Sequence, residues 1–179
     1  MAIDFVKLWK LVINAPKNRS GHTINGPDHW LRVERNACIL ANRTGAKINV
    51  VRLFALFHDS KRINYWTDSG HGQRGAEFAK ELCGSAFELS DEEPDLLVYA
   101  CTWHTDGLHH DDATIGTCRD ADRLDIERAG VIPNAKFMST DSGREIGNHG
   151  SVKPSLDFAK PHIVDPENHH VRTREFTDW

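Results

Sequence analysis

Apolar residues recur at intervals of three and four positions along most of the first 130 residues, the spacing that one face of an α-helix produces. Loops rich in glycine, proline and polar residues separate these stretches. The pattern predicts six helices, over residues 3–14, 28–42, 48–61, 71–82, 90–104 and 113–127. Pro27 suits the first turn of the second helix and Gly45 its C-terminal cap, whereas Ser90 and the acids after it suit the start of the fifth.

The helical pattern weakens after Gly130, where we expect only one short helix, near residues 141–147. We find no internal repeat and no sign of a second core. The sequence therefore predicts one helical domain over residues 1–130. Residues 131–179 should form a C-terminal extension that packs on or near the same domain.

Polar residues interrupt the apolar faces of three predicted helices. His58 follows Phe54 on the buried face of the third helix, and Asp59 is next to it; His29 begins the apolar face of the second helix, and Asp122 lies within that of the sixth. Taken singly, each of these residues is better interpreted as an ordinary hydrogen-bonded core residue than as a metal ligand. Burying all four is costly unless they share a partner, and a divalent metal ion would be one.

Two imidazoles and two carboxylates suit a divalent transition metal, namely Mn²⁺, Fe²⁺, Ni²⁺, Co²⁺ or Zn²⁺, better than Ca²⁺, with Mg²⁺ left open. His71 and His104 lie at the ends of the next two predicted helices and are reserve candidates. One ion is the simpler expectation and two are open. Gly72 and Gly75 follow His71, where they either allow another backbone to approach closely or loosen the first turn.

Composition adds bounds to this picture. The chain has 179 residues, of which 27% are charged and 39% hydrophobic, and its net charge is −4. These values are typical of one soluble domain, and they favour neither nucleic acid nor an anionic membrane as a partner. The first residues resemble a packing helix more than a signal peptide, and the four cysteines form no CxxC pair. We therefore expect a cytoplasmic protein with reduced, buried thiols, and a homodimer is a reasonable default.

Three segments together resemble a known signature. GPDHWLRV, LFHDSKR and CRDADRLD are similar, in order and spacing, to the H…HD…D pattern of the HD-domain metal-dependent phosphohydrolases, over about residues 20–130. The resemblance implies an all-α bundle of five to seven helices around a buried metal site. It also implies that the metal ligands are His29, His58, Asp59 and Asp122.

Two further segments, HGQRGAEF and the one around His104, look like additional blocks of bacterial members of uncharacterised function. Some members bind a second metal through histidines after the HD pair, and His71 and His104 match these in order. The Gly-Tyr-Pro block of the cyclic-dinucleotide group is absent.

The resemblance implies hydrolysis of a small phosphate ester, with a nucleotide favoured, by a phosphomonoesterase or a phosphodiesterase. Asp59, His71 and His104 are then the catalytic candidates. Phosphate requires cationic partners, and four basic residues next to the ligand positions are candidates for this role: Lys61, Arg62, Arg74 and Arg123.

Two other functions stay open at this point. A di-iron oxygenase on the same scaffold, similar to myo-inositol oxygenase, would use histidines in similar places. A non-catalytic module that binds a nucleotide or a metal would need the site but no turnover.

Overall fold

The computed structural model describes residues 2–15, 24–64 and 67–151. Within these ranges the chain forms seven α-helices and two 3₁₀ helices, and no strand longer than an isolated bridge. The all-α prediction is therefore confirmed. The elements are α1 (Phe5–Ile13), α2 (Pro27–Thr44), α3 (Ile48–Phe57), α4 (His71–Leu82), α5 (Glu93–Trp103), α6 (Ala113–Leu124), η1 (Asp125–Ala129), η2 (Ala135–Phe137) and α7 (Asp141–His149).

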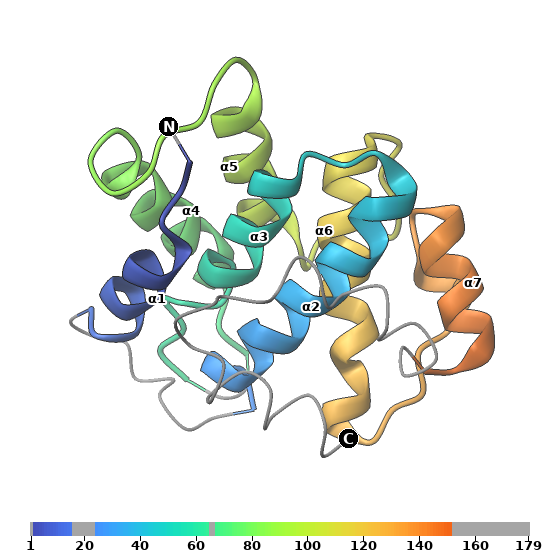
Figure 1. Cartoon of the computed structure of the whole chain (residues 1–179). Helices are drawn as coiled ribbons and strands as arrows, with labels where there is room; N and C mark the ends of the chain where they lie inside the picture. The colour runs from blue at the N-terminus through green and yellow to red at the C-terminus, as the bar shows by residue number, and fades with distance from the viewer. Residues whose placement is uncertain (1, 16–23, 65–66, 152–179) are drawn as a thin grey trace.

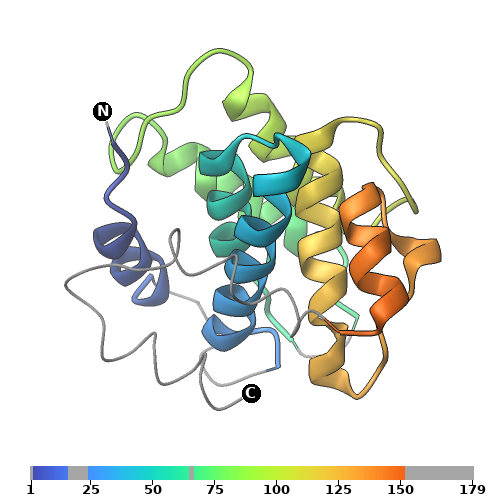
Figure 2. The same ribbon diagram turned by 45° about the vertical axis from the view of Figure 1, so that its right-hand side comes forward.

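The helices α2, α3 and α6 lie side by side at the centre of the bundle (Figures 1 and 2). The pair α4 and α5 packs against α3, α1 contacts α3 from outside, and α7 packs against α6 and α2. The core between them includes the fully buried Trp30, Phe54 and Phe57. Each such side chain contributes about 1.5–3 kcal/mol through burial. No helix in the described ranges combines the length and hydropathy needed to cross a bilayer.

Several predicted helix ends coincide with the observed ones. Pro27 lies in the first turn of α2, and Gly45 caps its end with a φ of 71°, a left-handed conformation that glycine adopts without strain. The bounds of α4 agree with the prediction, and α7 covers the short helix expected near residues 141–147.

The prediction for the third helix was wrong at its end. The α-helix α3 stops at Phe57, His58 is its C-cap residue, and a turn follows. Ser60 explains the early end, because both its backbone N–H and its hydroxyl donate to the carbonyl of Phe57, at 3.1 and 2.8 Å. The turn leaves Asp59 just beyond the end of α3.

Two other helix ends also differ from the prediction. The helix α5 begins at Glu93, and only half of the expected capping arrangement forms: the Glu93 carboxylate accepts the Ser90 N–H, but the Ser90 side chain does not cap the helix. The helix α6 ends at Leu124 and changes to a 3₁₀ turn. Ile126 therefore leaves the buried face, and 37% of its surface is exposed.

The glycines of α4 allow very close approach between backbones, as one of the two sequence interpretations expected. A Cβ atom on Gly75 would lie 2.3 Å from the carbonyl oxygen of Phe57, and one on Gly72 would lie 2.3 Å from that of Cys101. The first turn of α4, which carries His71, thus lies directly against the ends of α3 and α5.

Residues 131–151 pack against the bundle through Asp120. Its carboxylate is fully buried and accepts the backbone N–H groups of Ser139 and Thr140, at 2.6 and 2.8 Å, and the Thr140 hydroxyl. The remainder of the predicted extension, residues 152–179, lies outside the described residues.

Candidate metal centre

Four side chains from three helices and a turn converge between α2, α3 and α6. His29 on α2 and His58 at the end of α3 bring their Nε2 atoms within 3.1 Å of each other. The Nε2 atom of His29 also lies 3.3 Å from Oδ1 of Asp122 and 3.6 Å from Oδ2 of Asp59. Ligand atoms that share one transition metal at about 2.0–2.1 Å lie about 3.0–3.4 Å apart. The spacing of this first group, made by His29, His58, Asp59 and Asp122, therefore suits a metal ion.

A second group of ligand-type atoms adjoins the first. Oδ1 of Asp59 lies 3.2 Å from Nε2 of His71 and 3.7 Å from Nε2 of His104, and these two nitrogens are 3.0 Å apart. The two oxygens of Asp59 thus face different groups, Oδ2 the first and Oδ1 the second. Each group brings at least three buried ligand atoms within 4.8 Å of one another. The structure thus brings together all four ligands implied by the resemblance and both reserve histidines.

The other ring nitrogen of each histidine fixes which nitrogen carries the proton. Nδ1 of each of these four imidazoles faces only hydrogen-bond acceptors, so each Nδ1 carries a hydrogen and donates it. In the neutral rings, Nε2 therefore presents a lone pair, and lone pairs face each other across each His–His contact. The acceptors are the carbonyls of Phe54 and Ala55 for His58, of Asp68 for His71 and of Cys101 for His104, and the Asp125 carboxylate for His29.

Such a convergence of acceptors requires a positive charge. A proton on one ring would relieve one His–His contact, whereas a divalent ion would satisfy every atom of a group at once. The residues therefore fit a metal, and they would hold it through neutral imidazoles and ionised carboxylates.

The charge states of His58 and Asp59 also suit a metal. Burial lowers the pKa of His58 to about 4. Burial raises the pKa of Asp59, but the neighbouring histidines lower it more, so that it lies well below its usual range. Burial lowers the pKa of His29, whereas hydrogen bonds with Asp122 and Asp125 raise it more. At neutral pH, His58 is thus an unprotonated ligand beside an ionised Asp59.

Asp125 is a functional candidate that the sequence reasoning missed. It lies in the first turn after α6, is buried, and accepts Nδ1–H of His29 at 2.7 Å on one oxygen and Nε–H of Arg32 at 2.7 Å on the other. The available signal was its position three residues after Asp122. One turn of helix thus places one carboxylate at Nε2 of His29 and the next at its Nδ1.

The four predicted substrate contacts have different surroundings. Nζ of Lys61 lies 3.6 Å from the centre of the Phe78 ring, and Arg74 binds Asp68. The guanidinium of Arg123 donates to backbone carbonyls of Gly107, Leu108 and Phe137. Arg62 is the one of the four that contacts the ligand groups, because its Nε–H donates to Oδ1 of Asp59 at 3.0 Å.

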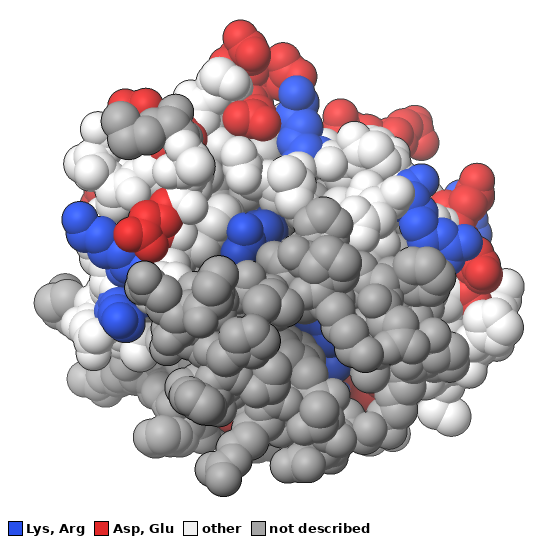
Figure 3. All heavy atoms as spheres, in the orientation of Figure 1, with Lys and Arg blue, Asp and Glu red and all other residues white. Residues whose placement is uncertain are grey.

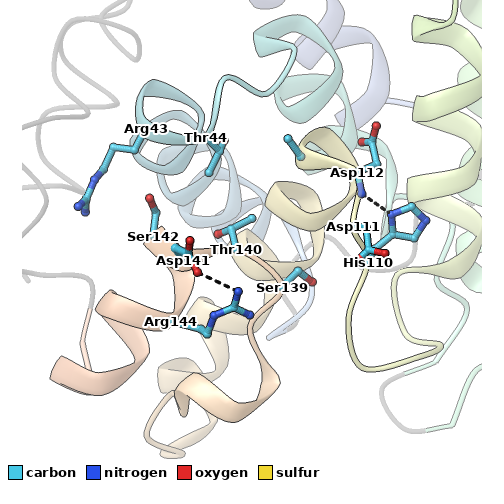
Figure 4. Close-up of a pocket in the computed structure, with 11 residues that line it drawn as sticks. Arg43, Thr44, His110, Asp111, Asp112, Ser139, Thr140, Asp141, Ser142 and Arg144 are labelled. Carbon is cyan, nitrogen blue, oxygen red and sulfur yellow. Dashed lines mark hydrogen bonds and ion pairs between the residues drawn. The ribbon is translucent and has the colours of Figure 1, made fainter.

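A surface pocket of about 370 Å³ opens elsewhere, beside the starts of α6 and α7 (Figure 4). Its charged side chains are largely engaged with the protein itself: Arg144 pairs with Asp141 at 3.0 Å, Arg43 with Glu145, and Asp112 caps α6. On the described part of the face in Figure 3, basic and acidic side chains are interspersed. Neither the pocket nor the described part of the face in Figure 3 gathers buried ligand-type side chains as the two groups do, so the two groups are the candidate functional site.

Comparisons with known proteins identify the family of this chain. The HD domain family matches residues 28–127, more than half of the chain, and this segment contains all six ligand candidates. The chain belongs to the HD domain family. A crystal structure of a predicted HD superfamily hydrolase from an uncultured Thermotogales bacterium is similar in fold, with a TM-score of 0.60 and 21% identity over 88% of each chain. Among curated proteins, no significant match is found.

Membership of the HD domain family supports the interpretation of the two ligand groups as places for a metal ion. HD domains bind divalent metals, and the family match supports a metal-dependent hydrolase at the level of the superfamily. The reaction and the substrate of this HD domain belong to the proposal that follows.

Proposed function

We propose that this HD domain is a metal-dependent phosphohydrolase that acts on a small phosphate ester. One observation carries the proposal: in the first group, the buried Nε2 lone pairs of His29 and His58 converge with carboxylate oxygens, and no hydrogen-bond donor lies between the two rings. Such an arrangement is costly in a protein that has no use for a cation. It is ready-made for one that does.

The first group would hold the metal that the reaction needs, through His29, His58, Asp59 and Asp122. A divalent ion there supplies Lewis acidity, which polarises a phosphoryl oxygen and lowers the pKa of water. The protein holds its ligands in place beforehand, since the imidazoles are anchored through Nδ1. Asp122 keeps 22% of its side chain exposed, against 0% for His29 and His58. The ester would therefore approach from the Asp122 side.

The second group offers a proton for the leaving oxygen when one metal is bound. Burial lowers the pKa of His104, but its hydrogen bond with Asp59 and the charge of that carboxylate raise it more, and the result is a raised pKa. A proton held at Nε2 between His104 and His71 would lie beside Asp59. Imidazole is suited to such general acid catalysis near neutral pH.

If the second group also held a metal, Asp59 would belong to both sets of ligands, because its Oδ2 faces the first group and its Oδ1 the second. Two-metal centres act on both the attacking and the leaving oxygen of a phosphoryl group. The family resemblance makes nucleotides the first substrates to test, as monoesters and as diesters.

The direct test is the metal content of the purified protein, measured by plasma mass spectrometry on wild type, His58→Ala and a control, His109→Ala. His109 is an exposed histidine outside both groups. We expect stoichiometric metal in the wild type and the control, and little in His58→Ala. The loaded protein then enters a screen of phosphatase and phosphodiesterase substrates.

The outcomes separate the candidate functions. Phosphate release that depends on His58 supports the proposal. Iron content with O₂ consumption in place of hydrolysis would favour the di-iron oxygenase, and binding without turnover with every metal would favour the non-catalytic module. If neither wild type nor control held metal after incubation with Mn²⁺, Fe²⁺, Ni²⁺ or Zn²⁺, the proposal would be wrong.

A further inference from the structure

The Arg62 side chain lies against the second group of ligands. Its Nε–H donates to Oδ1 of Asp59 at 3.0 Å, and its Nη2 lies 3.5 Å from Nε2 of His71. Because Nδ1 of His71 carries the hydrogen given to the Asp68 carbonyl, Nε2 receives the Nη2–H. Arg62 thus contacts two of the three side chains that make up the second group, Asp59, His71 and His104.

A metal in the second group would need these same two atoms. It would bind Oδ1 of Asp59 and Nε2 of His71, and it would also bring two positive charges close to a guanidinium that cannot lose its own. The Arg62 side chain is only 14% exposed, so the protein and not bulk solvent surrounds this charge. The contacts of the first group differ, because no arginine donates to Oδ2 of Asp59 or to Nε2 of His29 or His58 among the described residues.

We propose that Arg62 is the resident cation of the second group, so that this protein holds one metal ion tightly and takes a second only in competition with the arginine. This inference rests on the proposed metal centre and assigns its metal count to a single side chain. The second ion is disfavoured although its three ligands are in place. Arg62 also keeps His71 and Asp59 in position while only one ion is bound.

The test is a calorimetric titration of chelator-stripped protein with Mn²⁺, on wild type, Arg62→Met and Arg144→Met. Methionine keeps much of the length of the arginine without its charge or its donors. Arg144→Met is a matched control, because Arg144 also contacts an aspartate three residues earlier at 3.0 Å and its loss changes the net charge equally. Arg62→Gln, which keeps a donor, is a second neutral variant in case the methionine variant folds poorly, and circular dichroism checks all of them.

In the wild type and in Arg144→Met we expect one tight equivalent of Mn²⁺ and a second that binds at least tenfold more weakly. In Arg62→Met the second equivalent should tighten by about tenfold or more, because the competing positive charge beside Asp59 and His71 is gone. Paired Mn²⁺ ions should then give an exchange-coupled signal in electron paramagnetic resonance. Adding His104→Gln to Arg62→Met should remove the gain, which assigns it to the second group.

Failure of this inference differs from failure of the proposed function. If Arg62→Met bound the second ion no more tightly than wild type, or if the gain survived His104→Gln, the role of Arg62 would be refuted while the first ion still bound. If wild type bound neither Mn²⁺ nor Fe²⁺, Ni²⁺ or Zn²⁺, the metal centre itself would be refuted.

Discussion

Replacing Asp125 by asparagine should weaken metal binding without touching a metal ligand. The Asp125 carboxylate accepts two hydrogens on two different oxygens, from Nδ1 of His29 and from Nε of Arg32, each at 2.7 Å. An asparagine side chain has one oxygen and one NH₂ group. It can serve one of these donors, and it must then direct its own N–H groups at the other.

The expected magnitude follows from these contacts. Asp125 is buried, with a relative exposure of 3%. Losing one of its charge-assisted hydrogen bonds should therefore lower the free energy of unfolding of the metal-free protein by about 1.5–3 kcal/mol. That corresponds to a fall in Tm of about 3–12 °C for a chain of this size. Metal binding should weaken by a further factor of about 10–100, because Asp125 no longer holds His29 in the tautomer and orientation that present Nε2.

Two assays separate these effects. Urea unfolding of the metal-free protein measures the structural part, and Mn²⁺ calorimetry at a temperature where both proteins are folded measures the metal part. Asp141→Asn is the control, since Asp141 also contacts an arginine but its side chain is 99% exposed, and we expect no more than about 0.5 kcal/mol from it. An Asp125→Asn protein that loses stability but binds Mn²⁺ as the wild type does would show that Asp125 supports the fold and not the centre.

Three further results are expected. With free Mn²⁺ at about 100 times its Kd, adding a chelator should lower the Tm by about 5–11 °C, and adding Mn²⁺ back should restore it. An unchanged Tm would contradict a metal bound to the folded state. Gly75→Ala should lower the free energy of unfolding by about 1–3 kcal/mol in a urea titration, because its Cβ would lie 2.3 Å from the Phe57 carbonyl, whereas exposed Gln73→Ala should change it little; equal stability of the two variants would disprove the close approach. Burial raises the pKa of the Cys101 and Cys118 thiols, and the half-buried Cys83 is the most accessible of the four cysteines. Ellman's reagent should therefore detect one readily reacting thiol, Cys83, in native protein and four in denaturant. Four reactive thiols in native protein would contradict the packing.

The sequence predicted what local spacing determines. Apolar periodicity is a property of neighbouring residues, and it was sufficient for seven helices and for the faces that carry the buried His29 and His58 and the half-buried Asp122. Proline and glycine marked both ends of α2 for equally local reasons. The end of α3 was missed because side-chain hydrogen bonds of Ser60 decide it, and periodicity carries no record of them.

Contacts between distant segments were harder to foresee. The burial of Asp120 could not be foreseen, because the sequence pattern of α6 reports only the side that faces α2 and α3. The segment at Ser139 and Thr140 covers the other side, and only its arrival makes a buried carboxylate there favourable. Arg62 could be recognised as a cation near the ligands, but its contact with His71 depends on the first turn of α4 lying against the end of α3.

Asp122 and Asp125 show how a local rule and a distant contact combine at one histidine. Their spacing of three residues places both carboxylates on the same side of the chain as α6 passes into its 3₁₀ turn. Since α2 lies alongside, Asp122 meets Nε2 of His29 at 3.3 Å and Asp125 meets Nδ1 at 2.7 Å. One imidazole therefore joins α2 to α6 through both of its nitrogens, and replacing His29 should disturb the packing of these helices as well as the metal site. We infer that the centre and the α2–α6 contact are stabilised together, so that metal binding should protect the amides of both helices from hydrogen exchange.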